Sequence, residues 1–230
     1  KERELIMETR KSANIGARLD RLPNSGWHIK MWLVTAFALL VCWSNGIGGS
    51  VQNILLNELH WLEPGTKLLA MWGTTYTAGL FGALVGGPIG DKIGRKKSIL
   101  LYEIIHIIAM IGGAIAPNIY VLYVFRLVQG FGLGALLVVL FAGFTEYVPG
   151  RTRGVWSSRN SFIGNWAHPI CNGIAFLIVT TGISYNMNWR IQYMIPSVLS
   201  IIASIIIAKK LPESPRWLEA QGRVDEADAI

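Results

Sequence analysis

Polar side chains recur along one apolar stretch of the chain at the spacing of an α-helix. They are spaced by four, three and four residues: Ser161, Asn165, His168 and Asn172. In a helix this spacing places all four on one narrow face. Hydroxyl, amide and imidazole groups both donate and accept hydrogen bonds, which is the chemistry that holds a small polar solute. We therefore predict that this face lines a polar cavity, and polar contact between packed helices is the alternative.

Two further apolar stretches carry candidate pathway residues. Asn45 and Gln52 form a weaker polar stripe in one, and Arg126 and Gln129 lie in another. Arg126 is about six residues inside its stretch, where an unpaired charge costs about 2.5–3.5 kcal/mol, so a partner is expected. The alternative for Arg126 is that its long side chain reaches the outer interface.

A carboxylate and an imidazole share one helix face in the stretch between these two. Glu103 and His106 are three residues apart, and histidine titrates near physiological pH, so the two could form a proton site. The interpretation that the sequence favours is different. Glu103 would extend toward Arg95, Lys96 or Lys97 at the nearby end of the helix.

The elements that must position these residues are transmembrane helices. The 230-residue chain is 52% hydrophobic and only 15% charged. Six stretches lack Asp, Glu, Lys and Arg, and their lengths are close to the roughly 20 residues that a helix needs to cross a bilayer. This pattern predicts an all-α integral membrane protein and excludes a soluble enzyme, a disordered chain and a secreted disulfide scaffold. The expected spans are about 31–55, 68–90, 98–116, 120–145, 157–181 and 190–208.

The basic residues predict which side of the membrane each end occupies. All but three of the 21 Lys and Arg residues fall before the first span, after the last, or in alternate loops. The positive-inside rule therefore places both termini in the cytoplasm, with 1–30 as an N-terminal segment, 31–210 as the six-helix bundle and 211–230 as the start of a linker helix. Ser214 and Pro215 are expected as its N-cap and first residue. Because the charges form no single patch, no nucleic-acid partner is predicted despite the net charge of +7.

Glycine spacing and short connections predict how the helices pack. Glycines spaced by four, at Gly82, Gly86 and Gly90 and at Gly130 and Gly134, should let helix backbones approach closely. A loop of about seven residues, GDKIGRKK, and a shorter turn at Pro117 and Asn118 should make successive helices antiparallel neighbours.

Four motifs occur in order along the chain. They are Gly87, Asp91, Lys92, Gly94, Arg95, Lys96 and Lys97; Arg126, Gln129, Gly130, Gly132 and Gly134; EYVPGRTRG, which contains Glu146, Arg153 and Gly154; and PESPRWLEAQGR at 212–223, which contains Glu213 and Arg216. Together these resemble the amino-terminal half of a major facilitator superfamily transporter, in the subgroup of sugar porters and metabolite:proton symporters. The resemblance covers roughly 12–230.

The resemblance implies a fold and a function. The fold would be the amino-terminal bundle of this superfamily, in a bilayer and most naturally the plasma membrane, with a carboxy-terminal six-helix half as its partner. The function would be transport of a small polar metabolite, such as a sugar or organic acid, by alternating access. The energy would come from the solute gradient alone or from protons in symport, and no enzymatic reaction or cofactor is expected.

The resemblance also implies roles for individual residues. A cytoplasmic gate that closes against the second half would include Gly87, Asp91, Gly94, Arg95, Lys96, Glu146, Arg153, Glu213 and Arg216. Arg126 would face an Asp of the first helix, but this sequence has Ser44 or Asn45 there.

Two other classes of protein remain as alternatives. One is a truncated or non-transporting receptor or interaction protein on the same scaffold. The other is a membrane-embedded enzyme, which is disfavoured because the sequence has no HExxH motif, paired intramembrane Asp or Cys/His cluster. No metal site is predicted either.

Overall fold

The computed structural model describes residues 15–42, 51, 54–61 and 67–230, and these residues form helices and turns without any strand. The elements are α2 (Ile15–Arg21), α3 (Gly26–Cys42), a π-helical turn at Ile54–Glu58, α5 (Lys67–Ile93), α6 (Arg95–Ala114), α7 (Ile119–Tyr147), a 3₁₀ turn at Gly150–Thr152, α8 (Arg153–Thr180), α9 (Tyr185–Lys210), α10 (Pro215–Ala220) and α11 (Val224–Asp228). The prediction of an all-α chain is confirmed.

Long apolar helices account for most of the described chain. Four are long and apolar enough to cross a bilayer, at 95–114, 119–147, 150–180 and 185–210, and a fifth counts if α2 and α3, bent by 105°, are taken as one span. The protein is therefore a multi-pass membrane protein, while the predicted number of six spans and the cytoplasmic placement of the termini stay predictions. Residues 43–50 and 52–53 of the first expected span lie outside the described residues.

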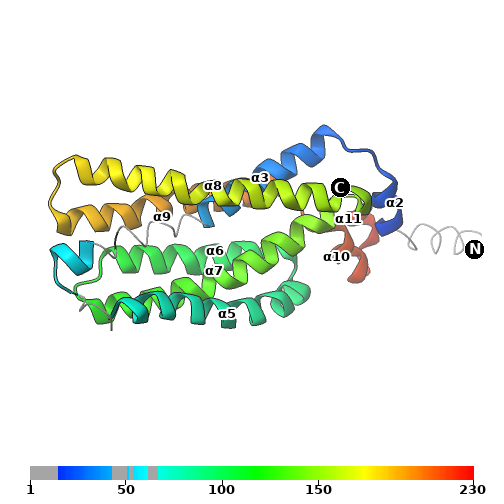
Figure 1. Cartoon of the computed structure of the whole chain (residues 1–230). Helices are drawn as coiled ribbons and strands as arrows, with labels where there is room; N and C mark the ends of the chain where they lie inside the picture. Colours follow the sequence, from blue (N-terminus) through cyan, green and yellow to red (C-terminus); the bar gives the residue numbers. More distant parts are fainter. Residues whose placement is uncertain (1–14, 43–50, 52–53, 62–66) are drawn as a thin grey trace, which may run out of the picture.

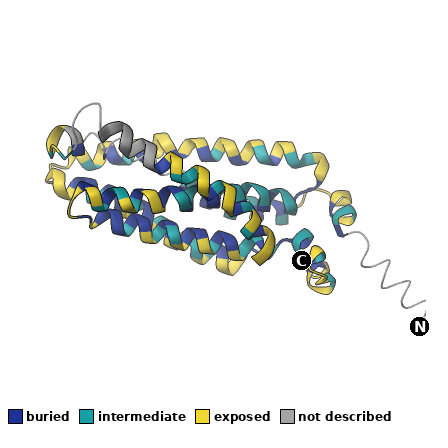
Figure 2. Cartoon of the chain, turned by 90° about the horizontal axis from the view of Figure 1, so that it is seen from below, coloured by how far each residue is buried: buried dark blue, intermediate teal, exposed yellow. Residues whose placement is uncertain are grey.

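The long helices run lengthwise in an elongated bundle (Figure 1). The helix α7 packs against α5, α6 and α3, and α9 packs against α6 and α3, while α8 lies mainly on α3. Buried residues line the inward faces of the helices and exposed residues the outward faces (Figure 2). The outward faces carry many large apolar side chains, as expected for helices that contact lipid.

Glycines bring α5 and α7 into backbone contact. A Cβ atom at Gly86 would lie 2.6 Å from the Cα of Ala135, and one at Gly130 would overlap the backbone of Thr75. Gly134 lies equally close to Gly79. The predicted close approach is confirmed, and the structure adds that its partners are α5 and α7, which are not consecutive in the chain.

The connection between α5 and α6 differs from the predicted loop. The helix α5 continues through Ile93 and α6 begins at Arg95, so Gly94 alone joins them. Its φ of 101° is a conformation that suits glycine and turns the chain sharply. The prediction of a seven-residue loop was wrong because Lys and Arg are good helix formers, so charge marked the membrane boundary and not the end of a helix.

Other helices also extend past the apolar stretches. The connection between α7 and α8 is shorter than the inner loop expected at 146–156, because α7 runs to Tyr147 and α8 starts at Arg153. The turn before α7 is short, as predicted, and the Asn118 side chain caps α7 by accepting a hydrogen bond from the Val121 amide at 3.0 Å. The turn between α8 and α9 comprises residues 181–184.

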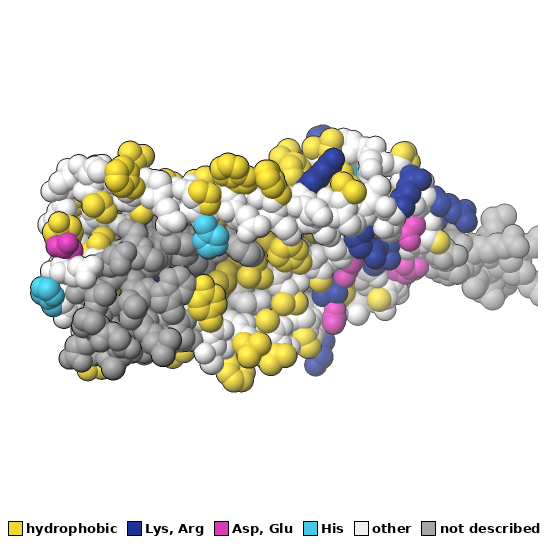
Figure 3. Space-filling view, viewed as in Figure 1, with side chains coloured by type: hydrophobic (Ala, Val, Ile, Leu, Met, Phe, Trp, Pro, Cys, Tyr) yellow, Lys and Arg dark blue, Asp and Glu magenta, His cyan; other side chains and the backbone are white. Residues whose placement is uncertain are grey.

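The two ends of the described chain meet at one end of the bundle, which we call the charged end (Figure 1). On the face shown in Figure 3, most Lys, Arg, Asp and Glu side chains gather there. Ser214 caps α10 and Pro215 is its first residue, as predicted. The expected linker helix is divided into α10 and α11, and both pack against α2 through Ile15, Leu218 and Ala227.

Candidate functional site

The predicted polar stripe lies on an exposed face of α8. The side chains of all four members are exposed: Ser161, Asn165, His168 and Asn172. They belong to a helix that meets the length and apolarity of a membrane span. Four polar groups turned away from their own bundle are costly in lipid, so the surface fits a water-filled path or a second protein half.

The rest of α8 explains how this face is held. Its buried residues are Trp156, Asn160, Gly164, Ala167, Cys171 and Ala175, and most of them are small at helical spacing. The main packing partner of α8 is α3. Phe162 and Trp166 are exposed on another side and pack edge to face, with 6.2 Å between their ring centroids. The polar stripe thus occupies a sector between the packed side and an apolar side suited to lipid.

Arg126 is buried and paired, so the alternative of an arginine reaching the outer interface is wrong. The residue is 6% exposed, and its Nη1 donates a 2.7 Å hydrogen bond to the Tyr193 hydroxyl on α9. The partner described for this guanidinium is thus a phenol oxygen on α9, while the first-helix position where the resemblance implies a carboxylate lies outside the described residues. Sequence reasoning missed Tyr193 because it lies 67 residues away and on a different helix.

Gln129 lies one turn further along α7 and is also buried. Its Nε2 lies 2.6 Å from the Met110 Sδ on α6. Asn45 and Gln52, the candidates on the first helix, lie outside the described residues, as does Ser44.

Glu103 and His106 lie inside the bundle on α6. Both are 0% exposed, and among the described residues neither the carboxylate oxygens nor the ring nitrogens have a hydrogen-bond partner of good geometry. The favoured interpretation, in which Glu103 extends toward Arg95, Lys96 or Lys97, is therefore wrong. Arg95 is engaged elsewhere.

Several residues predicted to belong to the cytoplasmic gate form a network around Arg95 at the charged end. Its Nη2 lies 2.7 Å from both the Asp91 Oδ1 and the Glu146 Oε1, and its Nε donates to the same Glu146 oxygen at 2.9 Å. The side chains of Arg95 and Glu146 are mostly buried, whereas that of Asp91 is 66% exposed. The local cation near Asp91 is thus Arg95, and Asp91 keeps most of its surface available.

Glu213 connects the segment before α10 to the start of α6. Its Oε1 accepts hydrogen bonds from the Lys96 amide and from the Ser214 amide, each at 3.0 Å. A carboxylate at the N-terminus of a helix is stabilised by the unpaired amides and the helix dipole. Gly94 makes room for it, because a Cβ there would overlap the Glu213 carboxylate.

Arg216 joins α10 to the N-terminal segment. Its Nη2 lies 2.8 Å from the Asp20 Oδ1, which also accepts a 2.8 Å hydrogen bond from the Gly150 amide. Arg153 is half-buried, and its Nε has no hydrogen-bond partner in the part of the chain that the structure describes. A Cβ at Gly87 would make an ordinary contact with Val138, 3.7 Å away. Most of the predicted gate residues therefore meet at one end of the bundle.

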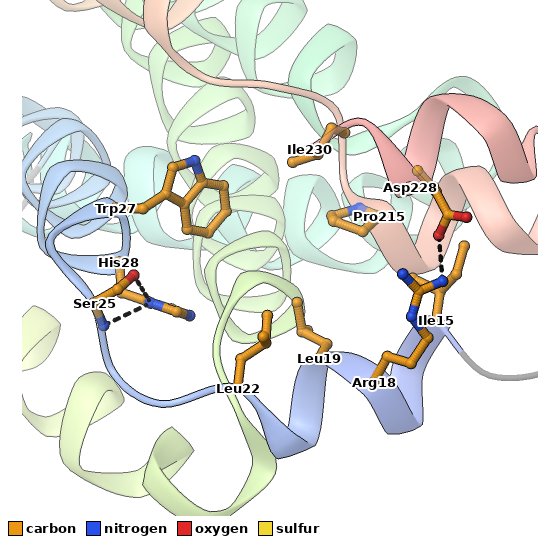
Figure 4. Close-up of a pocket in the computed structure, with 11 residues that line it drawn as sticks. Ile15, Arg18, Leu19, Leu22, Ser25, Trp27, His28, Pro215, Asp228 and Ile230 are labelled. Atoms are coloured by element: carbon orange, nitrogen blue, oxygen red, sulfur yellow. Dashed lines mark hydrogen bonds and ion pairs between the residues drawn. The ribbon is translucent and has the colours of Figure 1, made fainter.

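A cavity of about 400 Å³ lies beside this network, between α2, the start of α3 and the C-terminal segment from Pro215 to Ile230 (Figure 4). Arg18 and Asp228 form an ion pair of 2.7 Å on one side of it. Ser25 contacts the ring of His28 on another. Within the described residues, no three His, Cys, Asp or Glu side chains are grouped as a metal site requires.

Comparisons with known proteins agree with this geometry. Residues 58–230 match the family model "Sugar (and other) transporter". The chain is 53% identical over 225 residues to the putative metabolite transport protein YdjK of Escherichia coli, covering 97% of this chain and 48% of that protein. It is 35% identical to the inner membrane metabolite transport protein YdjE of E. coli, covering 93% and 46%.

Solved structures support the same fold. The inward-open, partially occluded xylose transporter XylE from E. coli matches with a TM-score of 0.77 at 19% identity, covering 89% of this chain and 53% of that one. The chain spans about half the length of the curated relatives it matches. We conclude that this chain belongs to the sugar (and other) transporter family and corresponds to an amino-terminal half.

Proposed function

We propose that the chain is the amino-terminal half of a secondary transporter, and that the exposed polar face of α8 forms its part of the site for a small polar solute. The observation that carries the proposal is the stripe from Ser161 to Asn172 on a membrane-crossing helix. A carboxy-terminal half would cover the other side of the solute, because such sites lie between the two halves near the bilayer midplane.

The chemistry of the stripe favours an uncharged solute rich in hydroxyl groups. It offers one hydroxyl, two amides and one imidazole, and no permanent charge. A sugar or polyol satisfies such groups, whereas an organic acid would need a cation at the stripe. The one buried cation described in the membrane part of α7, Arg126, is bonded to Tyr193. Arg126 and Gln129 remain proposed pathway residues, whose contact with solute would require the Tyr193 bond to open.

The charged end suggests how the path closes. We place it in the cytoplasm of a cell bounded by the plasma membrane, because the positive-inside rule favours that side for basic residues. Six spans then put both termini there. The exposed carboxylate of Asp91 is available to the second half, while Arg95, Glu146 and Glu213 hold the segments behind it.

The test is uptake by the full-length protein in proteoliposomes. Radiolabelled D-xylose, D-glucose and myo-inositol would be offered with and without an imposed pH gradient. We expect saturable uptake of at least one of them, and loss of most of that uptake in His168→Ala and Asn165→Ala. Leu177→Ala, on the same exposed apolar side of α8 as Phe162 and Trp166, is the matched control and should keep it.

Two results would contradict the proposal. Absence of uptake for every hydroxylated solute would favour the receptor alternative. Unchanged uptake in both His168→Ala and Arg126→Ala would show that the site lies elsewhere.

A further inference from the structure

A buried seam of unusual composition runs along one face of α6. Its members are Glu103, His106, Met110 and Gly113, spaced by three, four and three residues, and all are buried. Glu103 is eight residues after the start of α6, about 12 Å into the helix at 1.5 Å per residue. Two ionisable groups therefore lie within the membrane part of the bundle.

No counter-charge compensates Glu103 among the residues that the structure describes. The groups that face it are the Cys42 thiol on α3 and the Ser200 hydroxyl on α9. On α7 the charged side chains are Arg126 and Glu146, which bond to Tyr193 and Arg95. The charged residues described near the end of α5, Asp91 and Lys92, lie at the charged end.

Burial of this kind favours one protonation state. An isolated ionised carboxylate in an apolar interior is so costly that the group holds a proton instead. The same argument makes the buried His106 ring neutral. Glu103 is therefore expected as a carboxylic acid in this conformation, with Ser200 beside it and His106 one turn further along the helix.

The seam leads from Glu103 to Arg126. The Met110 sulfur contacts the Gln129 amide on α7. A Cβ at Gly113 would lie 3.0 Å from the ring of Tyr193, so that ring rests directly on α6. Tyr193 in turn holds Arg126 through its hydroxyl. A change of charge in the seam would thus act on the residues that hold the buried arginine.

We propose that Glu103 is the proton-binding residue of this transporter and that His106 is the group next to it on the proton's route. The proposal rests on the proposed function as a transporter. Binding leaves Glu103 as a neutral acid in the closed bundle; release produces a carboxylate, which this packing disfavours and which a rearranged bundle must hydrate or pair with His106 as a cation.

Infrared difference spectroscopy of the full-length protein in lipid tests protonation without any solute. On raising the pH we expect the carbonyl band of a carboxylic acid to disappear while a carboxylate band appears. The pair of bands should be lost in Glu103→Gln and retained in Glu58→Gln, which alters a carboxylate on the exposed π-helical turn. Ser200→Ala should shift the frequency of the acid band while keeping its amplitude. This second variant tests the assignment of the band to Glu103 even if Glu103→Gln fails to fold.

Three outcomes would overturn the proposal. The first is an acid band that persists at every pH at which the protein is folded, because Glu103 would then be a permanent neutral hydrogen-bonding group. The second is a titrating band that survives in Glu103→Gln, and the third is a band that Ser200→Ala leaves unshifted. Failure of the proposed function would give a different result. The protein would then take up none of the three radiolabelled solutes, while the infrared band of Glu103 could still titrate.

Discussion

Replacing Gly134 with alanine probes a close backbone contact between α5 and α7. The new Cβ would lie 2.8 Å from the Cα of Gly79 and would overlap the Gly79 carbonyl oxygen. Carbon atoms in contact are about 3.5–4.0 Å apart, so α5 and α7 would have to separate locally by about 1 Å. Backbone cannot rotate out of the way as a side chain can, and neighbouring contacts along the two helices would open as well.

This geometry sets the size of the effect. Overpacking of a well-packed interior costs about 1–3 kcal/mol of stability. The matched control is Gly173→Ala on α8, where nothing lies within 4 Å of the added atom. That change should stabilise the helix by about 0.5–1 kcal/mol, because alanine is the better helix former.

The two variants would be compared in the full-length protein by reversible unfolding in mixed micelles, with far-ultraviolet circular dichroism as the signal. Gly134→Ala should unfold at a lower denaturant fraction than the parent and Gly173→Ala at an equal or higher one. Equal stability of the two variants would refute the backbone contact between α5 and α7.

The remaining predictions concern single contacts, read by the same unfolding assay. Glu146→Gln removes the carboxylate that binds Arg95 and should cost about 1.5–3 kcal/mol, as expected for a mostly buried hydrogen bond to a charged group. Gly94→Ala forces a Cβ into a conformation at φ 101° and should cost about 1–3 kcal/mol. Tyr193→Phe leaves the Arg126 Nη1 without the acceptor it has here, and should cost about 1–3 kcal/mol and weaken uptake.

Each of these has a matched control on the same or a neighbouring helix. Asp91→Asn changes an exposed partner of the same guanidinium and should cost less than about 1 kcal/mol. Gly87→Ala adds a Cβ that has room, and Tyr120→Phe removes the hydroxyl of an exposed tyrosine. A control that loses as much stability as its test variant would show that the contact in question is not the cause.

Patterns confined to one helix could be predicted well from the sequence. The spacing of Gly82 and Gly86 predicted a close contact, and the periodicity from Ser161 to Asn172 placed a polar stripe on one face. Both follow from the 3.6-residue repeat, which every helix obeys regardless of its neighbours. Ser214 was also predictable, because an N-cap uses only local hydrogen bonds.

Contacts between distant segments could not be predicted in this way. Tyr193 as the partner of Arg126 depends on how α7 and α9 pack, and nothing near either residue encodes it. The burial of Glu103 was missed for the same reason, since hydropathy allowed it to reach the nearby basic residues. The contact between α2 and α10 is of the same kind, because it joins Asp20 to Arg216, 196 residues away.

The single-residue connection at Gly94 fixes the rotational register of α6. One inserted or deleted residue between Ile93 and Arg95 would turn the whole of α6 by about 100° about its axis, since 3.6 residues complete a turn. Glu103 would then leave the bundle interior and meet lipid, and the Arg95 guanidinium would move away from Glu146. A substitution changes the contacts of one side chain, whereas a change of length just before Arg95 would displace every contact that α6 makes.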